Sequence, residues 1–214
     1  MRCMTIFLSV ATEHSKNKRE GFRHRWHERR CWRGVRQFAK TAIMISVVIV
    51  CRNQEPELSV TLSSLVQGAV EGLVAEVVVV DRGSTDGTAV LADAAGCRYV
   101  VEADLREVVR EVRGEWILFI EAGARPLLGW VEHLHQHVMS GGKPARFSPS
   151  REYRLPFLSR IMKRPSALTH GVLMPKRQAI ANCRSGSSVE AVVRGVATHK
   201  LNCEIVPASV LSLA

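Results

Sequence analysis

The sequence lacks the cysteine spacing on which structural zinc sites and redox sites depend. Its six cysteines lie far apart, and no two of them form a Cys-x-x-Cys pair. Zinc ribbons and thioredoxin-like sites use such pairs, so the sequence gives no support to either class of site. Scattered cysteines suit a reducing compartment, and we therefore expect a cytoplasmic protein.

Long apolar segments are also missing. The longest apolar stretch, residues 42–51, includes Ser46 and is about half as long as a membrane-spanning helix. Residues 4–11 are too short for the apolar part of a secretion signal, and arginine- and histidine-rich sequence follows them. We expect neither a transmembrane segment nor a secretion signal. Internal repeats and low-complexity tracts are likewise missing.

Positive charge is abundant but unevenly distributed. The chain has a formal net charge of +10, of which residues 1–43 carry +8 and residues 44–214 only +2. No apolar period organises the first segment, so we expect 1–43 to be a disordered basic arm. Such arms can bind nucleic acid or anionic lipid. Met44 immediately precedes a strand pattern, which favours the alternative that translation starts there; nucleic acid is therefore not the expected partner.

The rest of the chain alternates strand and helix patterns. Four apolar runs rich in β-branched residues predict buried strands, and amphipathic or capped segments between them predict helices. The expected strands are 45–50, 77–80, 98–101 and 116–120, and the expected helices are 55–68, 89–95, 105–112 and 130–139. We expect Leu58, Leu62, Leu65 and Val66 to form the inner stripe of the first helix, and Ser84 or Thr85 to cap the second.

This alternation predicts an α/β fold with a mostly parallel, open sheet. In such folds ligands bind at the carboxyl ends of the strands. Two unusual segments, 81–88 and 121–126, follow strands at such ends. Residues 140–170 contain several prolines and many basic residues, and we expect a connection there without a core. Order is expected to resume in 171–214, with a final strand at 203–206.

Three blocks of sequence resemble family 2 glycosyltransferases of the GT-A fold. They are 45–53 (ISVVIVCRN), 77–88 (VVVVDRGSTDGT) and 113–119 (RGEWILF), and they occur in the family's order and spacing. The resemblance implies a single Rossmann-like GT-A domain whose half 44–139 binds a nucleotide-sugar donor. It makes Asp81 a donor-site residue, with Asn53 and Ser84 beside it in the matching loops.

The sequence departs from this family at two positions. The family usually has two successive aspartates after the second strand, and the second commonly binds the base; here it is Arg82, which has no hydrogen-bond acceptor for a base N–H. The family's Asp-x-Asp metal motif is represented by Glu121, Ala122 and Gly123. Glu121 can still ligate Mg²⁺ or Mn²⁺, but Gly123 cannot, so we expect weak metal binding or none.

Arg82 and Arg125 both follow strands at the expected ligand-binding edge. One hypothesis is that their guanidinium groups bind phosphate oxygens in place of the metal. The alternative is that both are solvated loop residues.

The acceptor half, 171–214, matches the family poorly. Glu190 lies where a catalytic acid or base would be sought, with a surface helix residue as the alternative. His133 and His137 are one helical turn apart, but a solvated helix face explains them better than a metal site. The basic stretch 151–164 could contact an anionic membrane, as would suit a lipid-linked acceptor, or be an exposed linker.

These observations predict a glycosyltransferase that moves a sugar from a nucleotide-activated donor to a glycan or lipid-linked acceptor. It would be cytoplasmic, or peripheral on the inner face of the membrane. The alternative is a non-catalytic relative that keeps the GT-A fold for binding or assembly, because strands are intact while site residues have changed.

Overall fold

The computed structural model describes residues 43–152 and 166–213. The first part of this chain contains β1 (Ile45–Cys51), α1 (Glu55–Val70), β2 (Val74–Asp81), α2 (Thr88–Ala94), β3 (Arg98–Val101), α3 (Leu105–Glu111), β4 (Trp116–Glu121), β5 (Arg125–Pro126) and α4 (Trp130–Met139). The second part contains β6 (Ala145–Pro149), β7 (Val172–Pro175), α6 (Lys176–Asn182), α7 (Val189–Val193), β8 (His199–Val206) and η1 (Ala208–Leu213). Residues 1–42 of the expected arm and 153–165 of the basic stretch lie outside the described residues.

The strands form one sheet in the order β3-β2-β1-β4-β7-β6-β8-β5. The first four are parallel, as their β-branched runs predict. The remainder is mixed, because β7 is antiparallel to β4, β6 is antiparallel to β7, and β8 is parallel to β6. The α/β class is therefore confirmed, and the parallel character belongs to the half that carries the three sequence blocks.

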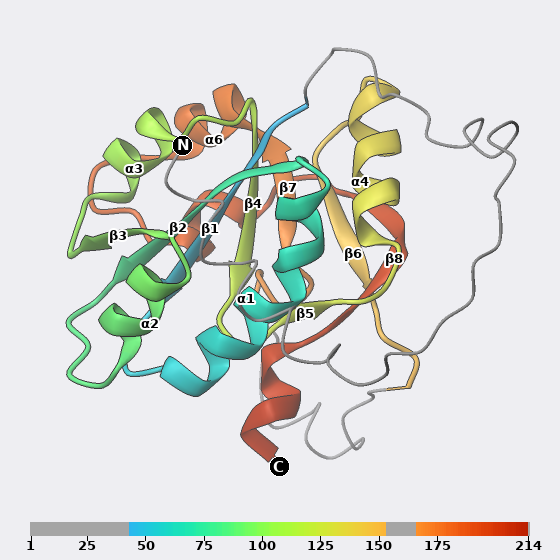
Figure 1. Cartoon of the computed structure of the whole chain (residues 1–214). Coiled ribbons are helices and arrows are strands. Elements are labelled where there is room, and N and C mark those ends of the chain that lie inside the picture. The colour runs from blue at the N-terminus through green and yellow to red at the C-terminus, as the bar shows by residue number, and fades with distance from the viewer. Residues whose placement is uncertain (1–42, 153–165, 214) are drawn as a thin grey trace, which may run out of the picture. The chain divides into compact units, whose positions relative to one another are not determined.

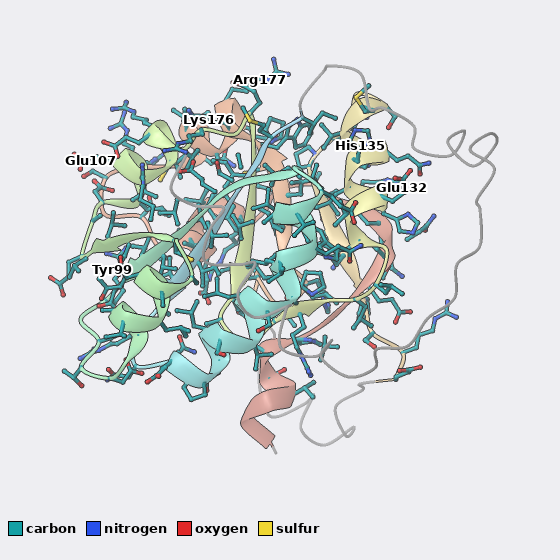
Figure 2. All side chains as sticks on the ribbon, in the orientation of Figure 1. Tyr99, Glu107, Glu132, His135, Lys176 and Arg177 are labelled. Carbon is teal, nitrogen blue, oxygen red and sulfur yellow. The ribbon has the colours of Figure 1, made fainter. Side chains whose placement is uncertain are left out.

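Helices cover both faces of the sheet (Figure 1). Alternate residues of β1 point to opposite faces, so Val47 and Ile49 lie in one core and Val48 in the other. The first core also includes side chains of α1 and α4, and the second includes side chains of α3, α6 and α7. Figure 2 shows charged side chains such as Glu107 and Glu132 on the outer sides of these layers. The sheet is thus held rigidly between two apolar layers, with its strand ends free for a site.

A strand lies in the region that we expected to be a connection without a core. In β6, Ala145 and Phe147 are buried while Arg146 between them is exposed. This alternation is the mark of a strand, but five residues bounded by glycines and prolines give too short a pattern to stand out. β8 also begins earlier than expected, at His199, because its first residues are polar and exposed.

The first helix packs through small residues as well as through leucines. Thr61 and Gly68 are buried with Leu58 and Leu65, whereas Leu62 and Val66 of the expected stripe are only half-buried. A β-carbon on Gly68 would lie 2.5 Å from the Trp130 ring, so the glycine lets α1 approach α4 closely. Gly68 is therefore an interior packing residue and not the end of the helix.

A hydrogen-bonded cluster lies at the amino ends of strands β1 and β4. The Ser46 hydroxyl donates to Glu76 at 2.8 Å and accepts from the Gly114 N–H at 2.8 Å. The Arg113 N–H also donates to Glu76. This cluster explains why the Arg-Gly-Glu block has a glycine: a β-carbon on Gly114 would lie 2.5 Å from the Ser46 nitrogen.

We expect Gly114→Ala to lower the free energy of unfolding by about 3 kcal/mol or more, because backbone and not a flexible side chain would have to move. Gly72→Ala is the control, since Gly72 has a φ of +76° but no atom near its β-carbon position. That variant should lose only about 1 kcal/mol, the cost of the backbone conformation alone. Urea unfolding measures both, and equal losses would contradict the steric explanation.

In the described parts of the chain, no helix combines the length and the apolar character needed to cross a lipid bilayer.

Candidate active site

The loops after β1 and β2 are joined to each other by hydrogen bonds. The Asn53 N–H donates to the Ser84 hydroxyl at 2.8 Å, and the Asn53 side-chain oxygen accepts from the Thr85 N–H at 2.7 Å. Asn53 has a φ of 51°, a conformation that asparagine tolerates better than most residues. Two of the expected donor-site residues, Asn53 and Ser84, are therefore brought into direct contact.

A second pair of contacts links the starts of α1 and α2. The Asp86 carboxylate accepts from the Glu55 N–H at 3.1 Å, and the Glu55 carboxylate accepts from the Gly87 N–H at 2.9 Å. Asp86 also accepts from the Thr88 N–H at 3.1 Å. The expectation that Ser84 or Thr85 caps α2 is therefore wrong, because the N-cap position is Gly87 and Asp86 accepts from the Thr88 N–H, while Ser84 and Thr85 bind Asn53. We call these cross-contacts between 53–55 and 84–87 the loop latch.

Asp81 stabilises the loop latch through hydrogen bonds to the loop after β2. It is buried, and its carboxylate accepts from the Ser84 N–H at 2.8 Å, the Gly83 N–H at 3.2 Å, and the Ser84 hydroxyl. Burial alone would raise the Asp81 pKa, but hydrogen bonds from Ser84, Tyr99 and Gly83 outweigh it and hold the pKa below its usual value. Asp81 thus fixes the shape of the loop after β2 from its buried position.

The lowered Asp81 pKa predicts a loss of stability in acid. Its contribution is fully present above the unfolded-state pKa of about 4 and is lost as pH falls through the lower folded-state pKa. We expect Ser84→Ala to be less stable than the wild-type protein at pH 6, and the difference to shrink toward pH 2 as Asp81 becomes protonated in both. Urea unfolding across this range measures the difference. Ser63→Ala removes an exposed hydroxyl that is bonded only to a helix carbonyl. The difference between its free energy of unfolding and that of the wild-type protein should therefore not change with pH.

The two arginines of the metal-replacement hypothesis lie in different parts of the sheet. The Arg82 guanidinium donates to the Ala103 carbonyl at 3.1 Å, on the β3 side of β2. Arg125 lies in β5, which pairs with β8 at the other end of the strand order. Each arginine can still contact a donor separately, but the arrangement does not support the binding of one diphosphate by both arginines.

The turn after β4 explains the glycine of the altered metal motif. The Ala124 N–H donates to the Glu121 carbonyl at 3.1 Å, and Gly123 has a φ of +96°. This combination defines a turn whose third residue is preferably glycine. The Gly123 N–H donates to the Thr61 hydroxyl at 2.7 Å, which ties the turn to α1. A side chain at position 123 would therefore strain the backbone, which accounts for the glycine at this position of the turn.

Glu121, at the carboxyl end of β4, and Glu190, in α7, both lie near Ser166. The Ser166 hydroxyl donates to Glu190 at 3.1 Å and also lies within hydrogen-bonding reach of Glu121. Burial raises the Glu121 pKa and the Glu190 charge raises it further, while the Ser166 contact opposes the rise. We call Glu121 and Glu190 the carboxylate pair. The structure brings together two residues that the sequence suggested for separate roles.

The carboxylate pair has the right chemistry for a hard divalent cation. Mg²⁺ and Mn²⁺ are commonly bound through one or two carboxylates together with substrate phosphates, so Glu121 with its neighbours fits such an ion. Among residues 43–152 and 166–213, no group of three or more His, Cys, Asp or Glu side chains could hold a metal by itself. His137 stacks on His199 with ring centres 5.4 Å apart and contacts the Lys143 carbonyl, which gives it a structural environment.

Three site residues were not identified from the sequence. Thr61, Tyr99 and Ser166 each act through a hydroxyl that reaches a segment distant in the chain. The position of Thr61 in the sequence offered one clue, because it is a polar residue about one turn from Leu58 on the buried side of α1. Tyr99 and Ser166 left none, since isolated hydroxyls in a strand and a loop are common.

Comparison with known proteins finds relatives of this chain. The chain is 40% identical over 92 residues to glucosyl-3-phosphoglycerate synthase from Mycobacterium tuberculosis H37Rv, and to the same enzyme from Mycobacterium bovis, in a match covering 42% of this chain. The match spans only 28% of the length of these relatives.

Solved structures of the Mycobacterium tuberculosis enzyme are also similar. Its complex with Mn²⁺, UDP and glucosyl-3-phosphoglycerate has a TM-score of 0.48 and 23% identity, covering 64% of this chain and 58% of that one. Its complex with Mn²⁺ and UDP-glucose has a TM-score of 0.49 and 21% identity, covering 64% and 57%.

The family profile described as "Glycosyl transferase family 2" matches residues 46–156, which contain all of β1 except Ile45, β2 through β6, and the loops after β1 and β2. The match includes more than half of the chain and every residue of the loop latch. The chain therefore belongs to glycosyl transferase family 2.

Proposed function

We propose that this chain transfers a sugar from a nucleotide-activated donor to a hydroxyl group of an acceptor. The observation that carries the proposal is the meeting of Glu121 and Glu190 around Ser166, at the strand edge where the loop latch also lies. Sugar transfer from a nucleoside diphosphate needs charge stabilisation on the leaving group and a group that accepts the hydroxyl proton. A carboxylate of the pair can accept the proton directly, and the pair can serve the first need by holding a divalent cation together with the donor phosphates.

The donor is proposed to bind along the carboxyl ends of β1, β2 and β4. The loop latch would hold backbone N–H groups and the Ser84 region in a fixed arrangement toward the donor, with Asp81 acting through the loop. Either Arg82 or Arg125, but not both, would contribute a guanidinium group to the phosphate oxygens of the donor. The Mycobacterium tuberculosis relative, a glucosyl-3-phosphoglycerate synthase, has a solved structure with UDP-glucose, so uridine diphosphate sugars come first among the donors to be tried.

Glu121 is the residue proposed to hold Mg²⁺ or Mn²⁺ together with donor phosphates. Such a cation, when bound, neutralises the charge that develops on the departing nucleoside diphosphate. With Gly123 unable to add a second carboxylate, we expect the cation to bind weakly until the donor supplies its own oxygens. Glu190 is more exposed than Glu121, and from there it can orient the acceptor hydroxyl and accept its proton.

The acceptor is proposed to be a glycan or a lipid-linked molecule. The basic residues of 151–164 would then hold the protein on an anionic membrane from the cytoplasmic side. Sedimentation with anionic liposomes tests this, because the proposal requires binding that weakens as salt is added. Salt-independent binding, or none, would refute it.

A thermal-shift screen of the full chain tests the proposed function. Uridine, guanosine, adenosine and thymidine diphosphates and their sugar derivatives are compared with and without Mn²⁺. We expect one nucleotide series to raise Tm, because a ligand that binds only the folded state stabilises it. A non-catalytic member that has lost its donor site would respond to none of them.

A further inference from the structure

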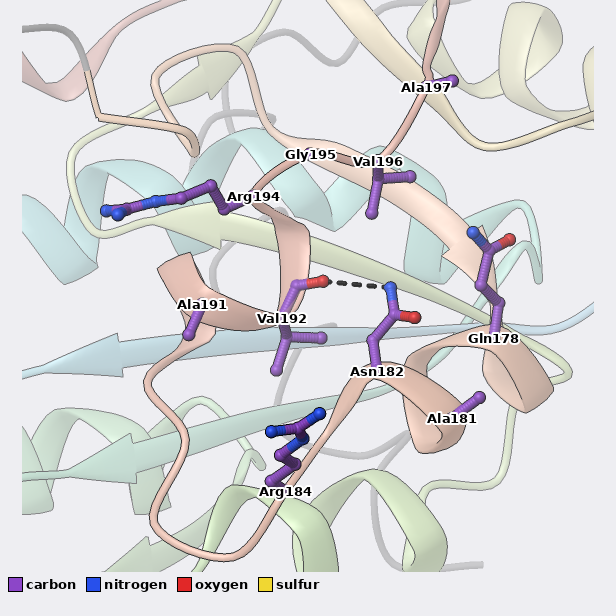
Figure 3. A pocket seen from close by; sticks show the side chains of 10 residues that line it. All are labelled: Gln178, Ala181, Asn182, Arg184, Ala191, Val192, Arg194, Gly195, Val196 and Ala197. Atoms are coloured by element: carbon purple, nitrogen blue, oxygen red, sulfur yellow. Dashed lines mark hydrogen bonds between the residues drawn. The ribbon is translucent and has the colours of Figure 1, made fainter.

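A polar pocket lies between α6, α7 and the segment that follows α7 (Figure 3). Its volume is about 420 Å³, within the range of small-molecule sites. Ten residues line it, including two arginines and no carboxylate. None of them belongs to the loop latch or to the carboxylate pair, so the donor site does not account for this pocket.

Arg184, an exposed residue, supplies positive charge at the wall of the pocket. Figure 3 shows its guanidinium group directed toward Asn182 and Val192, whereas Arg194 extends away from the other lining side chains. In residues 43–152 and 166–213 no ion pair connects Arg184 to a carboxylate. A guanidinium group presents several N–H donors in a plane and suits phosphate or carboxylate oxygens.

Asn182 supplies a fixed hydrogen-bond acceptor beside this charge. Its side-chain nitrogen donates to the Val192 carbonyl at 3.1 Å, drawn as the dashed line in Figure 3. That bond sets the orientation of the amide, so its oxygen is turned away from Val192 and is available to a ligand hydroxyl. Gln178, one turn earlier on α6, adds a second amide to the same wall.

We propose that this pocket binds a small hydroxylated anion, with its phosphate or carboxylate group on Arg184 and its hydroxyl groups on the amides of Asn182 and Gln178. The ligand would contact both α6 and α7, and α7 also carries Glu190 of the carboxylate pair. The proposal does not depend on the proposed transfer reaction. An ordinary solvated arginine near two helix ends is the alternative that the experiment must exclude.

Isothermal titration of the full chain with glycerol 1-phosphate tests the proposal. We expect saturable binding at constant ionic strength, and no binding of glycerol, which lacks the anion. Arg184→Ala should weaken the affinity at least tenfold, because hydrogen bonds to a charged group are among the stronger ones. Arg177→Ala is the matched control, since Figure 2 shows Arg177 extending outward from the start of α6. It should bind as the wild-type protein does.

Two further variants keep the result decisive. Gln178→Glu preserves side-chain size and places a negative charge in the pocket, so it should also weaken binding at least tenfold even if Arg184→Ala is unstable. Glu121→Gln alters the carboxylate pair and should leave glycerol 1-phosphate binding unchanged. The proposal is overturned if the anion does not bind saturably, if Arg184→Ala and Gln178→Glu bind it as tightly as the wild-type protein, or if Glu121→Gln abolishes binding.

Discussion

Glu121→Gln is expected to reduce the rate of sugar transfer by about a hundredfold to a thousandfold. The substitution keeps the shape of the side chain but removes the negative charge at the carboxyl end of β4, where the donor diphosphate and its cation are proposed to lie. Loss of one preorganised electrostatic contact to a transition state typically costs about this much. The rate is measured as release of nucleoside diphosphate from whichever donor the thermal-shift screen identifies.

The control for this variant lies immediately before the same strand. Glu115 is an exposed residue at the opposite end of β4, where its carbonyl accepts from the Lys176 N–H. Glu115→Gln makes the same chemical change far from the site, so it should leave the rate within about twofold of wild type. If Glu121→Gln retains full activity at saturating donor, then the carboxylate pair does not act in transfer.

Asn53→Ala is expected to reduce transfer by about a hundredfold while the protein stays folded. The variant loses the oxygen that accepts from the Thr85 N–H at 2.7 Å, so the loops after β1 and β2 lose one of the contacts that hold them in register. Displacement of a binding group by about 1 Å can cost a hundredfold in rate. Alanine also fits poorly at a φ of 51°. Donor affinity and transfer rate are measured together with the free energy of unfolding.

Two other substitutions at Asn53 separate the hydrogen bond from the backbone conformation. Asn53→Gly accepts the positive φ but lacks the oxygen, and Asn53→Asp keeps an oxygen in the same place and tolerates the conformation. The loop latch predicts that Gly resembles Ala in donor affinity and that Asp restores most of it. If Gly restored the affinity, the backbone conformation and not the latch would be the cause.

The parallel half of the fold could be predicted because its sequence carries strong local signals. β1, β2 and β4 are apolar runs; β1 and β4 form within one residue of the expected strands, and β2 begins three residues earlier than expected. β5 and β6 could not be predicted in this way. β5 has two residues, and β6 owes its place to pairing with β7 and β8, which are distant in sequence. Such pairing leaves little trace in local composition.

The site could be predicted where one loop holds it and not where distant segments meet. Asp81 and Ser84 lie in the same loop, and the sequence placed them together. Their partner across the latch, Asn53, was placed at the same edge of the sheet, but the direct contact was not foreseeable. The meeting of Glu121 and Glu190 depends on how β7, α6 and α7 fold back over β4, which no local pattern encodes.

The most direct test of a metal-assisted donor site at Glu121 is isothermal titration of the full chain with nucleoside diphosphates in the presence of Mn²⁺. We predict that at least one of them binds, that chelation of Mn²⁺ weakens its affinity at least tenfold, and that Glu121→Gln produces a comparable loss. Failure of every nucleoside diphosphate to bind, or binding that neither chelator nor Glu121→Gln changes, would contradict a donor site built on this residue.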